Sequence, residues 1–180
     1  MKAAAAEAPA SAPLLAVESL EVLYADVILA LKGVNLAVAN GGCTALLGPN
    51  GAGKSTTLKA ISGMLTVEDG KVSAGGVRYD GADLAGRDVQ QRVASGVVHV
   101  VEGRKVLRHM TVEQNLIVGG HLQPNLAAVR RGLDEVYATI PRLADLRART
   151  AGYLSGGEQQ QLLIARACCS STNPRWAWRR

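Results

Sequence analysis

Apolar and polar residues alternate along the first part of the chain in the two-residue period of β-strands. The pattern is strand-like from Leu14 to about Val38, where Val34, Leu36 and Val38 alternate with Asn35 and Ala37. Asn40-Gly41-Gly42 follows as a turn signal. Further along, Lys71-Val72-Ser73 and Val77-Arg78-Tyr79 flank Ala74-Gly75-Gly76, which predicts a β-hairpin.

Two short apolar runs read as buried strands of a parallel sheet. Thr44-Ala45-Leu46-Leu47 ends in a glycine-rich loop, and Val97-Val98-His99-Val100-Val101 is the second run. Continuous apolar runs of this length are typical of strands that are covered on both faces. They predict an α/β fold.

Four helices are predicted from helical spacing and from capping residues. The first spans Lys54 to about Met64, with Leu58, Ile61 and Leu65 on one face and Gly63 near its end. Thr111 with Gln114 forms a capping box that opens a helix to about Val118, and Pro124 to about Ile140 is a third helix. Ser155 with Glu158 forms a second capping box, which opens a helix that runs through Ala167.

Composition and charge narrow the function classes. The net charge is +5, but three of those charges are Arg175, Arg179 and Arg180, which leaves +2 for the rest of the chain. No lysine or arginine cluster interleaved with aromatic residues remains, so no nucleic acid partner is predicted. Residues 1–13 contain Glu7 and no sustained apolar run, which favours a disordered lead-in over a targeting segment.

Three cysteines, Cys43, Cys168 and Cys169, give neither a disulfide framework nor a metal-binding spacing. Cys43 is expected to be a small buried residue, and the setting is expected to be reducing. His99, His109 and His121 match no ligand or catalytic spacing and are interpreted as structural or surface residues.

The strongest chemical signal is Gly48-Pro49-Asn50-Gly51-Ala52-Gly53-Lys54-Ser55, which fits the phosphate-binding loop of P-loop NTPases. Backbone N–H groups can surround a triphosphate only where side chains do not intrude, hence the glycines. The following helix adds a favourable dipole. Lys54 is expected between the β- and γ-phosphates, Ser55 on Mg²⁺ and Thr56 at the α- or β-phosphate. The alternative is an ordinary glycine-rich turn before a helix.

A second anion-binding feature lies about a hundred residues further on, at Leu154-Ser155-Gly156-Gly157-Glu158-Gln159. A helix that begins with a serine and two glycines offers a hydroxyl, bare backbone N–H groups and a positive dipole end. Locally this is also a helix N-cap closed by Glu158. A second phosphate-binding site is not needed within a single nucleotide pocket that already has the glycine loop.

The second string resembles the signature sequence of ATP-binding cassette (ABC) proteins, and the resemblance covers roughly Leu14 to Ala167. It implies that the signature of one subunit caps the γ-phosphate of ATP held by the glycine loop of another. Tyr24 matches the aromatic residue on which these proteins stack adenine. Glu102 matches the Q-loop position, where most members carry Gln near Mg²⁺ and the attacking water, and it is a tentative catalytic and Mg²⁺ residue.

The variant Glu102-Gly103-Arg104, together with the run from Met110 to Leu116, resembles one ATPase of branched-chain amino acid importers. The implied fold has a RecA-like P-loop core, an antiparallel β subdomain and a helical subdomain from about Thr111 to Ala151. The implied partners are a second ATPase subunit in a head-to-tail dimer, membrane permease subunits and, indirectly, a periplasmic or extracellular solute-binding protein. The implied location is the cytoplasmic face of the membrane.

Residues 168–180 depart from the family pattern. Members follow the signature helix with an apolar strand that ends in Asp-Glu (the Walker B strand) and then a switch His, whereas this segment has no acid, apolar run or His. With GC-rich codons and one added C, it permits Leu-Leu-Leu-Leu-Asp-Glu-Pro-Ser-Leu-Gly-Leu-Ala-Pro. The hypothesis is a frameshift near Ala167, which divides the chain into a lead-in (1–13), an incomplete nucleotide-binding domain (14–167) and an out-of-family tail (168–180).

Such a chain is expected to be poorly soluble, because its core strands lose neighbours, and deficient in ATP hydrolysis. Two other functions stay open. One is a non-catalytic fragment that binds nucleotide or transporter without turnover. The other is a soluble ABC ATPase outside transport, which the single domain and the Glu102-Gly103-Arg104 loop disfavour.

Overall fold

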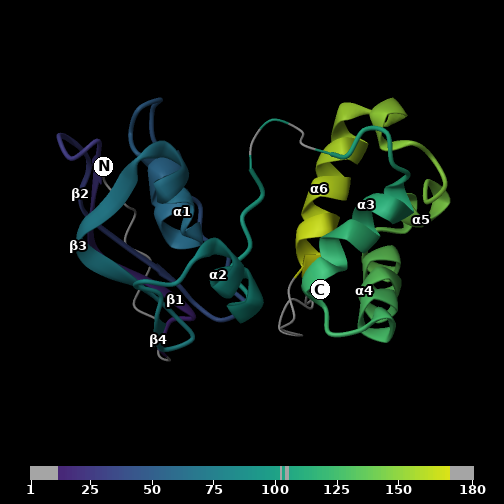
Figure 1. The fold of residues 1–180 in the computed structure, drawn as a ribbon, viewed down its shortest axis with the longest axis horizontal. Coiled ribbons are helices and arrows are strands. Elements are labelled where there is room, and N and C mark those ends of the chain that lie inside the picture. Colours follow the sequence, from purple (N-terminus) through teal and green to yellow (C-terminus); the bar gives the residue numbers. More distant parts are fainter. Residues whose placement is uncertain (1–11, 102, 104–105, 171–180) are drawn as a thin grey trace. The chain divides into compact units, whose positions relative to one another are not determined.

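The structure is a computed structural model that describes residues 12–101, 103 and 106–170. It divides into two compact units, residues 1–92 and 93–180 (Figure 1). The first combines a sheet with helices, and the second is helical. The α/β class is therefore confirmed.

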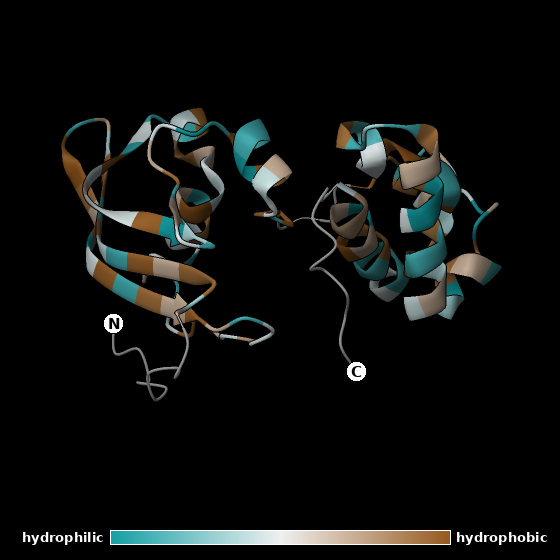
Figure 2. Ribbon diagram, turned by 90° about the horizontal axis from the view of Figure 1, so that it is seen from below, coloured by the Kyte–Doolittle hydropathy of each residue, from teal (hydrophilic) through white to brown (hydrophobic). Residues whose placement is uncertain are grey.

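The first unit contains a four-stranded antiparallel sheet of strand order β2-β1-β3-β4. Its strands are β1 (Leu15–Tyr24), β2 (Ile28–Val38), β3 (Gly70–Tyr79) and β4 (Ala82–Asp83). Polar and apolar residues alternate along the ribbon of the long strands (Figure 2). The strand prediction for 14–38 is confirmed as two strands, and the turn at Asn40 and Gly41 follows.

The predicted hairpin at 71–79 is wrong, because β3 is one continuous strand. The glycines make a bulge instead: Glu18 pairs with Gly76 and Glu21 pairs with Ala74, so the register shifts between them. Gly75 has φ +72°, and a Cβ there would lie 2.2 Å from the carbonyl oxygen of Ser19. The glycine therefore allows a close backbone approach between two strands rather than a chain reversal.

The two predicted parallel strands, 44–47 and 97–101, are also wrong. Neither segment belongs to a strand, and every strand pair within residues 12–101 and 106–170 is antiparallel. A strand needs a neighbouring strand to bond its backbone groups, and within the described residues neither segment is paired in the sheet. Leu47 is 80% exposed, so the apolar run is not covered.

Helix α1 (Lys54–Ser62) follows the glycine loop, as predicted. It ends at Gly63, whose φ of +78° provides a left-handed C-cap, and a 3₁₀ turn η1 (Met64–Glu68) follows. Of the three residues predicted on one face, Ile61 and Leu65 are buried against the sheet side of the unit, whereas Leu58 is 46% exposed. Thr57 is buried instead.

Arg92, in helix α2 (Val89–Ser95), holds the end of α1 in place. It is buried, and its guanidinium donates to the carbonyl oxygens of Ala60 (2.8 Å), Ile61 (2.9 Å), Leu84 (2.8 Å) and Arg87 (2.9 Å). Burial lowers the pKa of Arg92, yet these acceptors keep the charged group satisfied. No pattern in the sequence marked this residue.

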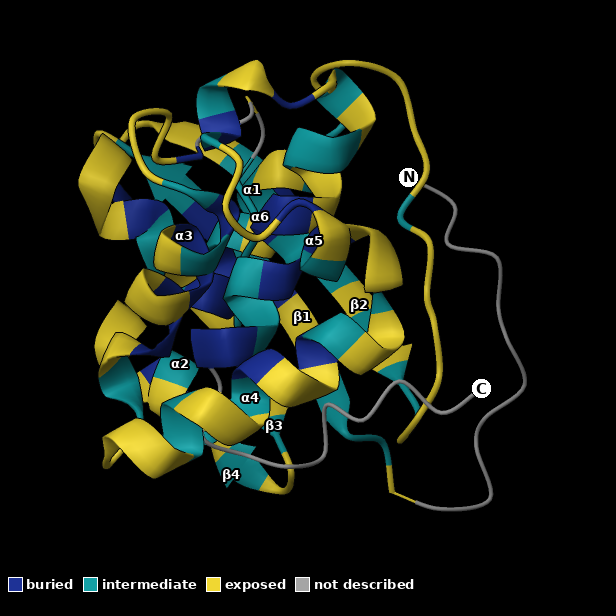
Figure 3. Ribbon diagram, turned by 90° about the vertical axis from the view of Figure 1, so that its right-hand side faces the viewer, coloured by how far each residue is buried: buried dark blue, intermediate teal, exposed yellow. Residues whose placement is uncertain are grey.

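The second unit packs four helices around one core: α3 (Val112–Gly119), α4 (Leu126–Thr139), α5 (Pro141–Asp145) and α6 (Gly156–Ser170). Short 3₁₀ turns, η2 (Gly120–Leu122) and η3 (Ala151–Tyr153), lie between them. Its core includes Val112, Leu116, Leu143, Ala151 and Leu162, which are fully buried; buried residues are dark blue in Figure 3.

The three helices predicted for this unit are confirmed, although α4 begins at Leu126 instead of Pro124 and α6 ends later than predicted; α5 was not predicted. Thr111 and Gln114 form the predicted capping box of α3. Helix α6 continues through Cys168 and Cys169 to Ser170, three residues beyond Ala167. In the described part of the chain, no helix has the length and apolar character needed to span a bilayer.

The cysteines should differ sharply in reactivity. Cys169 lies in the helical core, where burial raises the pKa of its thiol to about 12, whereas Cys43 is exposed and not buried as predicted. We expect iodoacetamide at pH 8 to modify Cys43 within minutes and Cys169 only after unfolding, because the thiolate is the nucleophile. Peptide mass spectrometry, with and without urea, measures this. Equal labelling of both cysteines in the native chain would contradict the buried position.

The raised pKa of Cys169 also fixes the sign of its pH dependence. The folded chain keeps the thiol proton up to about pH 12, while the unfolded thiol ionises near pH 8.5. The buried, protonated Cys169 thiol therefore makes its full contribution to the free energy of unfolding below about pH 8.5. This contribution is lost as the pH rises toward 12. Urea titrations at increasing pH should show the corresponding decline.

Candidate nucleotide-binding site

The glycine loop has the backbone conformation that its glycines predict. Gly51 and Gly53 have φ values of +80° and +83°, which residues with side chains rarely adopt. Gly53 is the N-cap of α1, and a Cβ there would lie 2.4 Å from Cδ2 of Leu31. Around Gly51, no atom lies within 4 Å of an added Cβ. The loop therefore leaves open space above bare backbone, as an anion site requires.

Lys54 folds back over this loop. Its Nζ donates to the carbonyl oxygens of Gly48 and Pro49, both at 2.7 Å. The loop is closed further by a bond of 3.2 Å from the Ala52 N–H to the Pro49 carbonyl. The cation thus lies at the mouth of the loop, held by acceptors that it can exchange for phosphate oxygens.

The hydroxyl residues after Lys54 have different surroundings. Ser55 is exposed, and no hydrogen bond of its hydroxyl occurs within the described residues. Thr56 is half-buried, whereas Thr57 is buried and its hydroxyl donates 2.9 Å to the Gly53 carbonyl. The described residues hold no group of three or more His, Cys, Asp or Glu that could bind a metal. A Mg²⁺ ion here would rely on Ser55 and on phosphate oxygens, which fits the exposed hydroxyl.

Tyr24 lies at the end of β1, opposite Gly70 of β3. Its ring lies against that glycine, since a Cβ on Gly70 would come within 2.7 Å of Cε1 of Tyr24. Near this ring, Lys59 of α1 bonds to Glu68 at 2.6 Å. This bond is the main reason why the pKa of Lys59 is raised, with a smaller contribution from Tyr24.

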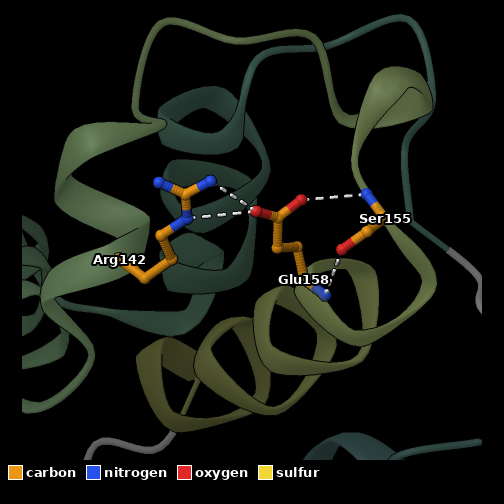
Figure 4. A network of polar contacts seen from close by, with 3 residues as sticks. All are labelled: Arg142, Ser155 and Glu158. Atoms are coloured by element: carbon orange, nitrogen blue, oxygen red, sulfur yellow. Dashed lines mark hydrogen bonds and ion pairs between the residues drawn. The ribbon is translucent and has the colours of Figure 1, made fainter.

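The signature residues form a capped helix start in the second unit (Figure 4). The Glu158 N–H donates to Oγ of Ser155 at 3.3 Å, and the Ser155 N–H donates to Oε2 of Glu158 at 2.9 Å. The predicted capping box is therefore present. Arg142 of α5 donates to the other carboxylate oxygen from Nε (3.1 Å) and from a terminal nitrogen (2.9 Å).

These bonds divide the six signature residues into two groups. Leu154 is buried, Glu158 closes the capping box, and the Gln159 side chain donates to the Leu154 carbonyl at 3.1 Å. Ser155 and Gly157 are exposed, and nothing lies within 4 Å of an added Cβ at Gly157. No hydrogen bond of the Gly156 and Gly157 amides is found among the described residues. Leu154, Glu158 and Gln159, here called the inward group, stabilise the turn. Ser155, Gly156 and Gly157, the outward group, offer hydrogen-bond donors.

Comparisons with known proteins agree with this geometry. The ABC transporter family profile matches residues 31–173. The chain belongs to the ABC transporter ATPase family. The nucleotide-free ATP-binding cassette of an ABC transporter superposes with a TM-score of 0.74 at 28% identity, covering 88% of this chain and 65% of that one. The ADP conformation of the cassette MJ1267 gives a TM-score of 0.73 at 27% identity, with coverages of 89% and 66%.

Several transport ATP-binding proteins are similar in sequence. The branched-chain amino acid transport protein BraG of Pseudomonas aeruginosa is 37% identical over 82% of this chain and 60% of its own length. The sulfate/thiosulfate import protein CysA of Bradyrhizobium diazoefficiens is 38% identical over 77% of this chain and 39% of its own. The phosphonates import protein PhnC of Hyphomonas neptunium is 36% identical, with coverages of 88% and 62%. This chain thus spans at most about three fifths of these relatives.

One ABC candidate, Glu102, lies outside the described residues. Next to that segment, Asn115 is a residue whose role the sequence did not reveal. Its fully buried amide accepts from the Leu107 N–H (2.8 Å) and donates to the carbonyls of Leu107 (3.0 Å) and Thr111 (2.9 Å). It ties the chain before α3 to the helix. The one feature of the sequence that could have indicated Asn115 is its position in the run from Met110 to Leu116, which resembles the ABC family.

Proposed function

We propose that this chain is the ATP-binding subunit of an ABC importer, which couples ATP binding and hydrolysis to solute uptake. The observation that carries the proposal is the glycine loop, with two left-handed glycines and Lys54 bonded across its mouth. In the proposal, Lys54 holds the β- and γ-phosphates, Ser55 ligates Mg²⁺ and Tyr24 stacks on adenine. Bound Mg²⁺ would neutralise charge on the phosphates.

The outward group of the signature supports a head-to-tail dimer. The Ser155 hydroxyl and the Gly156 and Gly157 amides would donate to the γ-phosphate of ATP held by the glycine loop of a partner subunit. Helix α6 has 15 residues, so its dipole adds to that attraction. Permease subunits and a solute-binding protein complete the proposed importer, with this subunit at the cytoplasmic face of the membrane.

Branched-chain amino acids are the proposed solutes, because BraG is among the similar proteins and the loop Glu102-Gly103-Arg104 resembles that group. Sulfate and phosphonates are the rival solutes, since CysA and PhnC have similar identities. Hydrolysis by this chain alone is proposed to be deficient. If the assembled transporter also fails to hydrolyse ATP, the chain is instead a non-catalytic fragment that binds nucleotide or transporter without turnover.

Lys54→Ala tests nucleotide binding directly. We expect the affinity for a fluorescent ATP analogue with Mg²⁺ to fall at least tenfold, because the phosphates lose a charge-assisted donor. Lys59→Ala is the matched control on the same helix, since its amine is bonded to Glu68. Equal affinities of Lys54→Ala and the unaltered chain, measured by fluorescence titration, would exclude the glycine loop as the ATP site.

Complementation tests the solute and separates an enzyme from a non-catalytic binder. The chain would be expressed in Pseudomonas aeruginosa lacking BraG, with Lys54→Ala as the control, and leucine uptake would be measured beside sulfate and phosphonate uptake. Restored leucine uptake supports the proposed solute. Intact ATP binding without phosphate release or uptake of any of the three would favour the non-catalytic alternative.

A further inference from the structure

A carboxylate lies beside the residues to which the proposed function gives a phosphate. Glu158 is in the first turn of α6, the helix whose Gly156 and Gly157 amides make no hydrogen bond among the described residues. An unpaired negative charge at this place would oppose the approach of a triphosphate, because like charges within a few ångströms repel. The signature of this chain therefore requires that the charge be neutralised or turned away.

Arg142 meets both requirements. Two of its nitrogens bond to a single oxygen of Glu158, at 3.1 and 2.9 Å, while the other oxygen accepts from the Ser155 N–H (Figure 4). All of these bonds hold the carboxylate between α5 and the start of α6. The pKa of Glu158 is lowered, first by its bonds to Ser155 and then by Arg142, so the group is ionised at neutral pH.

We propose that Arg142 is a positioning residue that neutralises Glu158 and thereby allows the signature to receive a phosphate. The inference rests on the proposed function and deepens it, because it concerns the same phosphate. Arg142 touches no substrate; it acts through Glu158, which in turn orients the Ser155 backbone and hydroxyl.

A simpler role for Arg142 is a tether between two helices. The two roles predict different results when both charges are removed. If the pair is a tether, Arg142→Ala, Glu158→Gln and the double variant all lose the same bond and bind phosphate equally poorly. If Arg142 neutralises a charge that repels phosphate, Glu158→Gln removes that charge and restores phosphate binding to the Arg142→Ala variant. Gln can still accept from the Ser155 N–H and close the capping box.

The experiment is an NMR titration of the ¹⁵N-labelled full chain with inorganic tripolyphosphate, following the amides of Gly156 and Gly157. Resonances of the glycine loop are followed separately. We expect Arg142→Ala to weaken the response of Gly156 and Gly157 about threefold to tenfold, and added salt to reduce that difference. The double variant should regain the affinity of the unaltered chain or exceed it.

Two controls complete the design. Arg131→Ala removes an exposed arginine of the same unit and should leave the signature response within twofold. Arg142→Lys keeps the charge without the forked contact and should retain most of the affinity.

The inference is overturned if the double variant binds as poorly as Arg142→Ala, or if Gly156 and Gly157 of the unaltered chain do not respond to tripolyphosphate. Failure of the proposed function is a separate result. In that case the resonances of Lys54 and Ser55 would not respond to Mg²⁺-ATP, whatever residue stands at position 142.

Discussion

Replacing Arg92 with Met should lower the free energy of unfolding of the first unit by about 3–5 kcal/mol. The substitution keeps an apolar stem of similar length but leaves the carbonyl oxygens of Ala60, Ile61, Leu84 and Arg87 without this donor. Buried acceptors that lose a charged donor carry the full cost of desolvation. Hydrogen exchange under increasing urea, measured on peptides of α1, reports this unit separately from the helical one.

Because α1 carries Lys54 and Ser55, this variant should also weaken ATP binding, although Arg92 lies at the opposite end of the helix. Arg78→Met, at an exposed position of β3, is the matched control and should change stability by less than about 0.5 kcal/mol. Unchanged protection of the α1 amides in Arg92→Met would show that the four bonds contribute little.

Replacing Asn115 with Leu should destabilise the helical unit by about 2–4 kcal/mol. The two side chains are similar in size, so the effect isolates the loss of the bonds to Leu107 and Thr111. We expect amides 106–111 to exchange faster even before the unit unfolds, because their anchor is lost. Urea unfolding followed by circular dichroism, together with exchange on this segment, measures both effects.

Gln161→Leu, at an exposed position of α6, is the control for Asn115→Leu. It should leave the free energy of unfolding almost unchanged. If Asn115→Leu were as stable as Gln161→Leu, the buried amide would be replaceable by packing alone. The chain before α3 would then hold its shape without it.

The sequence predicted well those features that depend on neighbouring residues. Thr111 with Gln114, and Ser155 with Glu158, form capping boxes whose partners lie three positions apart. The glycine loop depends on local φ values. In each case the chemistry needed to form the structure is contained in a few consecutive residues, so the pattern was sufficient.

Features that depend on distant residues were missed. The segment 44–47 has the composition of a buried strand, but composition cannot supply the neighbour that a strand requires. The glycines at 74–76 read as a turn because nothing local reveals that Gly75 lies against Ser19. The bonds of Arg92 to α1 span about thirty residues. The contact between Arg142 and Glu158 spans 16.

The exposed run 44–47 has a consequence for handling the protein. Its apolar side chains lie directly before the loop that would bind ATP, Leu47 is exposed, and within the described residues its backbone is not paired with any strand. Two such segments from different molecules can pair with each other, and this reaction becomes faster as the protein is concentrated. The colloidal state of a sample would then depend on concentration and storage time, so binding curves are best recorded in fresh, dilute solution.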